Sequence, residues 1–162
     1  MSVFRLPVAV LLAATMVLTA CALIKSEPKP QAPGWQGVTV MAAEDANANS
    51  AVAVDIVLVR DQAVLDSLLA MPAARYFAAR ADLQRTYPDA LTVVALEITP
   101  GQVIRLDARR FGGQRAWAAL AFAHYANPGE HRARLLLDNR GYVLQLNAQG
   151  MLATELTPGR AR

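Results

Sequence analysis

Apolar side chains change their spacing several times along this chain, and each change predicts a different element. Residues 37–43 alternate between apolar and polar and predict a strand. Residues 51–59, AVAVDIVLV, are β-branched and almost wholly apolar, which is typical of a central strand covered on both faces. Residues 44–50, EDANANS, are turn and loop formers. The chain therefore begins its domain with two strands joined by a polar loop.

Helical spacing follows the second strand. Asp61 is a candidate cap for a first helix, and the apolar residues after it recur at helical intervals: Val64, Leu65, Leu68 and Leu69. A second helix is predicted over residues 73–87, between Pro72 and Pro88. One stripe of this helix predicts core packing rather than a ligand platform: Tyr76, Ala79, Leu83 and Tyr87. Three arginines lie off the stripe: Arg75, Arg80 and Arg85.

The rest of the chain returns to strands. A strand over residues 90–98 leads into a type II turn with Pro100 and Gly101 at its centre. Residues 116–125 are rich in alanine, which favours helix, but ten residues between turn signals in a β-rich half favour a buried strand. Further strands are predicted at 103–109, 131–138, 142–147 and 151–156. The sum is a mainly β protein: an antiparallel sandwich of seven or eight strands with a helical insertion between the second and third.

Asp55 interrupts the most apolar strand. A buried carboxylate requires a partner, and the candidates on other strands are Arg105, Arg132 and Arg134. No second acid lies nearby in sequence, so a structural role is favoured over a catalytic one.

The first twenty residues have the features of a secretory signal. Arg5 precedes an apolar run over residues 8–20, which is too short to span a bilayer. The sequence Leu18-Thr19-Ala20-Cys21 resembles the bacterial lipobox, and Cys21 is the only cysteine of the chain. The resemblance implies a diacylglycerol thioether on the sulfur, cleavage before Cys21 and an acyl chain such as palmitate on the new amino group. An ordinary signal peptide beside a stray cysteine is the alternative.

Three acyl chains are enough for stable anchoring without a transmembrane helix. Ala22 follows the cysteine, and the absence of aspartate there predicts sorting to the outer membrane. Residues 21–35 form a lipidated, proline-rich tether, because closely spaced prolines favour extended geometry. The expected domain covers residues 36–157, followed by a disordered tail over 158–162. About 120 residues are enough for a single core.

Charge and motifs exclude several function classes. The net charge is only +3, and the arginines are scattered rather than interleaved with aromatics, so nucleic acid is not an expected partner. No G-x-S-x-G elbow, H-E-x-x-H motif or cysteine cluster is present. His124 and His131 flank a turn and are the one metal hypothesis, although a structural role for both is favoured. We expect no enzyme, cofactor or metal.

Residues 38–60, VTVMAAEDANANSAVAVDIVLVR, resemble the start of the outer-membrane lipoproteins of type VI secretion systems, the TssJ family. The similarity continues through the helical segment, the ITPG turn, the strand AWAALAFAHY, the NPG turn and the strand HRARL. It implies a transthyretin-like sandwich that is not an enzyme. Such a lipoprotein lies on the periplasmic face of the outer membrane and holds the periplasmic part of a large inner-membrane component.

The family binds that partner largely through the loop between its first two strands. The corresponding residues here are Glu44, Asp45, Ala46, Asn47, Ala48, Asn49 and Ser50. This loop is shorter than is usual in the family and lacks its Gly-Arg-Pro stretch. Two other functions stay open: a pilotin or assembly lipoprotein of another envelope machine, and a lipid-anchored hydrolase or ligand binder. A deep pocket lined by His124, Asp55 and a serine would indicate the hydrolase.

Overall fold

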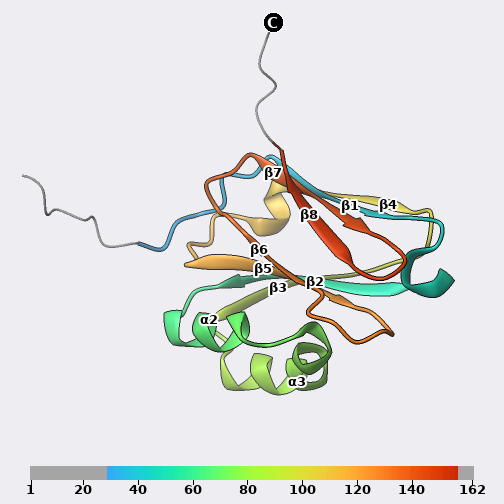
Figure 1. Ribbon diagram of the computed structural model, residues 1–162. Helices are drawn as coiled ribbons and strands as arrows, with labels where there is room; N and C mark the ends of the chain where they lie inside the picture. The colour runs from blue at the N-terminus through green and yellow to red at the C-terminus, as the bar shows by residue number, and fades with distance from the viewer. Residues whose placement is uncertain (1–28, 157–162) are drawn as a thin grey trace, which may run out of the picture.

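A computed structural model describes residues 29–156, which form two facing four-stranded sheets and a layer of helices (Figure 1). The first sheet has the order β4-β1-β7-β8, with β1 (Gly37–Ala42), β4 (Val103–Asp107), β7 (Gly141–Leu146) and β8 (Met151–Glu155). The second has the order β3-β2-β5-β6, with β2 (Val52–Val59), β3 (Leu91–Ile98), β5 (Ala118–His124) and β6 (Arg132–Leu135). The remaining elements are η1 (Ala46–Asn49), α2 (Gln62–Leu69), α3 (Ala73–Thr86) and η2 (Ala108–Phe111). The predicted sandwich with a helical insertion between β2 and β3 is confirmed.

One pair of strands in the described part of the chain runs parallel. β1 lies beside β7 with Gly37 opposite Gly141, whereas the other ladders are antiparallel. The backbones approach closely where this pair starts: a Cβ on Gly141 would lie 2.3 Å from the Gly37 carbonyl oxygen, and its φ is +151°. Glycine is therefore required at position 141.

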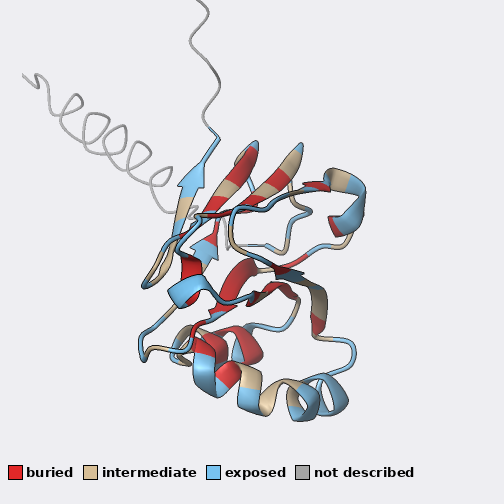
Figure 2. Cartoon of the chain, turned by 90° about the vertical axis from the view of Figure 1, so that its right-hand side faces the viewer, coloured by how far each residue is buried: buried red, intermediate tan, exposed pale blue. Residues whose placement is uncertain are grey.

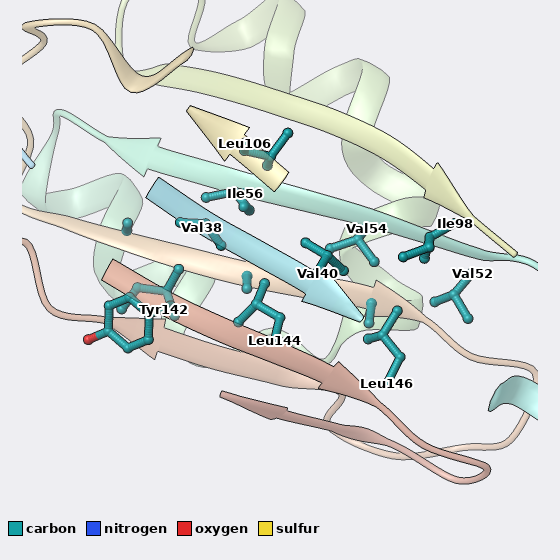
Figure 3. Close-up of a cluster of buried hydrophobic side chains, with 14 of the residues drawn as sticks. Val38, Val40, Val52, Val54, Ile56, Ile98, Leu106, Tyr142, Leu144 and Leu146 are labelled. Atoms are coloured by element: carbon teal, nitrogen blue, oxygen red, sulfur yellow. The ribbon is translucent and has the colours of Figure 1, made fainter. Parts of the chain in front are cut away.

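The space between the sheets is filled by alternate residues of the strands. Inward-facing side chains of β1, β2 and β7 interlock there (Figure 3): Val38, Val40, Val54, Ile56, Tyr142, Leu144 and Leu146. β5 contributes the small residues Ala119, Ala121 and Ala123 to the same core. The prediction of a strand for this alanine-rich segment is confirmed, because its larger residues Leu120 and Phe122 are buried on the other face.

Helices α2 and α3 cover the outer face of the second sheet (Figure 1). The predicted cap is present: the Val64 amide donates to Asp61 Oδ1 at 3.0 Å. Tyr76 of α3 stacks on Phe122 of β5 with ring centroids 4.0 Å apart. The predicted apolar stripe does not stay buried, because Tyr87 at its end is 41% exposed. Figure 2 shows the same trend, with burial concentrated in the sheets and on the sheet-facing side of the helices.

The predicted partner of Asp55 is wrong. Tyr76 donates its hydroxyl proton to Asp55 Oδ2 at 2.8 Å, and Arg80 Nε lies 2.8 Å from the same oxygen. Both partners come from α3 rather than from a neighbouring strand. The Asp55 side chain lies on the face of β2 that α2 and α3 cover, so its partners are helix residues rather than strand residues. Burial raises the pKa of Asp55, and the Tyr76 hydrogen bond and the Arg80 charge offset only part of this effect.

The folded part of the chain starts before the expected domain boundary. Gln31 pairs with Ala116 as an isolated bridge, and the Gly34 amide donates to the Leu137 carbonyl at 2.7 Å. Trp35 is 4% exposed and donates Nε1–H to the Leu136 carbonyl at 2.8 Å. Its ring meets those of Phe111 and Tyr142 edge to face. The last residues of the predicted tether are therefore attached to the sandwich.

Several predictions lie outside the described residues. They concern the signal peptide over 1–20, lipidation of Cys21, sorting by Ala22, the first part of the tether and the tail over 158–162. Within residues 29–156, no helix has both the length and the apolar character needed to cross a membrane.

Candidate partner-binding site

Four connections gather at one end of the sandwich as a consequence of strand direction. β1, β3, β5 and β7 finish at this end, and each following strand starts there. We call it the loop end; it comprises residues 43–51, 99–102, 125–131 and 147–150. Residues 29–36 reach the domain at the opposite end, which we call the entry end (Figure 1).

The predicted partner loop, Glu44–Ser50, forms part of the loop end. Its centre is the short helix η1, in which Ala46 and Asn47 are buried. The flanking residues are exposed: Glu44, Asp45, Ala48, Asn49 and Ser50. The loop is therefore a turn fixed by two buried residues, with its other side chains facing solvent.

Asn47 holds this turn against two other loops. Its Nδ2 donates to the Ala51 carbonyl at 3.1 Å, and its Oδ1 accepts from the Ala126 amide at 2.8 Å. Its backbone amide donates to the Asn147 carbonyl at 3.4 Å. Asn47 is only 6% exposed, so these bonds satisfy polar groups that have lost contact with water.

Three consecutive residues of the turn have left-handed backbone conformations. The φ angles are 48° at Asn47, 54° at Ala48 and 61° at Asn49. Asparagine tolerates this region better than most residues, whereas alanine in it costs on the order of 1 kcal/mol. Such a run persists only where its surroundings impose it, and the bonds of Asn47 supply that restraint.

The β5–β6 and β7–β8 connections are also joined to each other. The single hydroxyl proton of Tyr125 is shared between the Gly150 carbonyl at 2.7 Å and the Asn147 carbonyl at 3.1 Å. Burial raises the pKa of Tyr125 to about 12, so the hydroxyl stays a donor at neutral pH. His131 stacks on the Tyr125 ring at 4.6 Å. The loop end is thus one connected unit.

A hollow with a volume of about 550 Å³ opens between these three connections. It is lined by Asn47, Ala48, Ala126, Asn127, Ala148 and Gln149. None of these side chains titrates or acts as a nucleophile, so the hollow offers amide hydrogen bonds and methyl contacts. This chemistry suits binding rather than catalysis.

The loop end also carries charged side chains, none of which lines the hollow. Glu44, Asp45 and Glu130 are exposed, and Arg132 pairs with Glu130 at 3.2 Å. Glu44 also lies against the β3–β4 turn, where Gly101 has a φ of +75° and a Cβ would meet Glu44 Oε1 at 2.9 Å. The positive φ is the one that the predicted type II turn requires.

Among residues 29–156, His124, Asp55 and Ser67 of the hydrolase hypothesis do not assemble into a site. Asp55 is 1% exposed and is engaged by Tyr76 and Arg80. Ser67 donates its hydroxyl to the Ala63 carbonyl and lines a hollow between α2 and α3 that includes neither Asp55 nor His124. A buried carboxylate and a serine on a different hollow cannot act on one substrate.

His124 and His131 contact different aromatic rings. His124 stacks on Phe77 of α3 at 4.8 Å, on the helix-covered face, whereas Tyr125 beneath His131 belongs to the core between the sheets. Residues 29–156 contain no group of three or more His, Cys, Asp or Glu side chains placed to hold a metal.

Comparison with solved structures shows the fold. The chain superposes on Lip of Serratia marcescens, a membrane-bound component of the type VI secretion system, with a TM-score of 0.52 and 16% identity over 73% of this chain and 95% of that one. The type VI secretion lipoprotein TssJ1 of Pseudomonas aeruginosa superposes with a TM-score of 0.54 and 13% identity, over 75% of this chain and 95% of that one. This chain has the TssJ fold. A chain of a type VI membrane complex superposes with a TM-score of 0.52 and 16% identity, over 75% of this chain and 96% of that one. No family model and no curated protein matches the sequence.

The sequence does not indicate the roles of two residues of this TssJ fold. Asn47 is predicted as a member of the partner loop but not as a buried residue that holds it, and the available signal is its place in an N-A-N segment rich in residues that tolerate left-handed backbone. Arg80 was placed off the core stripe, although it follows Tyr76 by four positions and so shares its helix face. The two residues act as the polar anchors of the loop end and of the helical layer, respectively.

Proposed function

We propose that this chain is the lipid-anchored outer-membrane component of a bacterial type VI secretion system, with its loop end binding the periplasmic part of an inner-membrane component. The observation that carries the proposal is the fold: TssJ1 and Lip are type VI secretion proteins, and the chain covers 95% of each. The lipobox-like Leu18–Cys21 and the small Ala22 support an anchor at the periplasmic face of the outer membrane.

The positions of the entry end and the loop end support a domain whose entry end faces the membrane and whose loop end faces the partner. The chain enters at one end, and the candidate partner loop Glu44–Ser50 lies at the other (Figure 1). Cys21 precedes Lys29 by so few residues that even a fully extended segment spans at most about 30 Å. An anchored domain would therefore stay close to the membrane while its loop end faces the periplasm.

The sandwich suits a scaffold that bears load. Trp35 and Gly34 bond the incoming chain to the segment that precedes β7, and β7 pairs with β1 over its full length. Force applied through the lipid is passed to ladders of backbone hydrogen bonds, which share a shear load. The inner-membrane component would pull on the same ladders from the loop end.

Replacing the exposed residues of the partner loop tests the binding site. A variant with Glu44, Asp45, Ala48, Asn49 and Ser50 changed to a Gly-Ser stretch keeps the buried Ala46 and Asn47, so we expect an intact fold and weaker co-purification of the inner-membrane component. The matched control replaces residues 87–89, an exposed turn at the entry end, in the same way. Unchanged recovery by the loop variant would exclude this loop as the site.

Anchoring is tested separately. We expect Cys21→Ser to leave the outer-membrane fraction and to fail to support assembly of the secretion machine, because no thiol remains to accept the lipid. Mass spectrometry of the purified parent protein should show the acylated amino-terminal cysteine. A Cys21→Ser protein that still fractionates with membranes and supports secretion would contradict the anchor.

A further inference from the structure

We propose that the partner-binding surface is composite: the β1–β2, β5–β6 and β7–β8 connections act together, and Asn47 is the residue that positions them. This inference rests on the proposed function, since it assumes that the loop end meets the inner-membrane component. It extends the site beyond Glu44–Ser50 to two segments that the sequence did not indicate.

Each hydrogen-bonding group of Asn47 contacts a different segment. Nδ2 bonds the Ala51 carbonyl within its own connection, Oδ1 accepts from Ala126 in the β5–β6 connection, and the backbone amide donates to Asn147 in the β7–β8 connection. One buried amide thus sets the relative positions of all three. A change at Asn47 would shift the β1–β2 turn relative to the other two segments, which lie far from it in sequence.

The hollow is shared equally among the same three segments. The β1–β2 connection supplies Asn47 and Ala48, the β5–β6 connection supplies Ala126 and Asn127, and the β7–β8 connection supplies Ala148 and Gln149. The second and third segments hold each other independently of Asn47, through the Tyr125 hydroxyl and through Asn127 Nδ2, which donates to the Gln149 carbonyl at 3.1 Å. These two segments should therefore keep their shape when the first is altered.

The lining indicates the chemistry of the partner segment. Three amide side chains and three alanines surround the hollow, and no charged side chain lines it. A charged group inserted here would lose hydration without meeting an opposite charge, which is unfavourable. An uncharged turn of a folded protein, whose backbone N–H and C=O groups can pair with the amides, fits this lining.

Arginine substitutions in the second and third segments test the composite surface. Ala126→Arg and Gln149→Arg each place a long charged side chain at the hollow without touching Glu44–Ser50. The detergent-solubilised lipoprotein is titrated with the purified periplasmic domain of the inner-membrane component from the same organism. We expect about tenfold or greater loss of affinity for each, as for other central interface positions, with an unchanged unfolding temperature. Ala81→Arg, at an exposed alanine of α3, is the matched control.

The positioning role of Asn47 is tested by coupling. Asn47→Ala should weaken binding. Asn47→Asp should weaken it less, because one carboxylate oxygen can still accept from the Ala126 amide. Asn49→Ala, in the same turn, should weaken binding less than Asn47→Ala does. If Asn47 positions the hollow, Gln149→Arg costs less affinity in the Asn47→Ala background than in the parent. Additive losses would assign Asn47 a purely structural role and overturn this part of the inference.

The outcomes separate this inference from the proposed function. Parental affinity in both Ala126→Arg and Gln149→Arg would overturn the composite surface, while weak binding by the Gly-Ser loop variant would still uphold the β1–β2 loop as the site. Parental affinity in the loop variant itself would overturn both.

Discussion

The two sheets of the sandwich differ in how many of their faces are covered. In the first sheet, β1 alternates between buried and exposed or half-buried residues, because its outer face meets solvent. In the second sheet, every residue of β2 except Ala53 is buried, since the other sheet covers one face and α2 and α3 cover the other. The hydrophobic pattern of a strand therefore reports the number of layers around it.

Coverage of the second sheet brings a polar group into the interior. Asp55 lies under α3 with Tyr76 and Arg80 as its partners. The open sheet needs no such arrangement: its outer face carries Met41, paired with Val103 on one side, and both are about two-fifths exposed. The helical insertion thus stabilises one sheet by burial and adds one ionisable site that depends on its docking.

The largest contrast is expected from two matched outward-facing residues. Leu120 of β5 is 0% exposed beneath the helices, whereas Val143 of β7 is half-buried on the open face. Leu120→Ala should lower the free energy of unfolding by about 2–5 kcal/mol, because it leaves a cavity. Val143→Ala should lower it by less than about 1 kcal/mol. Urea unfolding measures both, and equal losses would contradict the difference in coverage.

A smaller effect is expected from the buried carboxylate. The pKa of Asp55 is raised above its ordinary value of 3.8 in the folded state, so the folded protein holds this proton more tightly than the unfolded chain does. The favourable contribution is present below pH 3.8 and is lost as the pH rises through the folded-state pKa. Asp55→Asn should therefore gain stability relative to the parent across that window, measured by urea unfolding between pH 3.5 and 7.

Aspartate at a surface site supplies the control for that pH series. Asp66→Asn makes the same chemical change at an exposed residue of α2, so it controls for the loss of one carboxylate in itself. A constant difference between Asp55→Asn and the parent at all pH values would show that Asp55 does not titrate differently in the folded state.

The strands and helices could be predicted from the sequence because burial of one face imposes a regular spacing of apolar residues within each element. The alanine-rich β5 was the hardest, and the turn signals around it favoured the correct strand over its helix propensity. The partner of Asp55 and the role of Asn47 depend on which segments meet in space, and spacing along the chain does not encode that. The attachment of Trp35 was hidden by the prolines before it, which favour extended chain whether or not that chain is docked.

The central claim is that the loop end, and neither the helical layer nor the open sheet face, meets the inner-membrane component. Photocrosslinking in living cells tests it most directly, with a crosslinking amino acid at Asn49 or Gln149 on the loop end and at Ala81 or Thr154 elsewhere, all exposed positions. We predict that mass spectrometry identifies the inner-membrane component in crosslinks from Asn49 and Gln149 alone. Its capture from Ala81 or Thr154, with none from the loop end, would contradict the account.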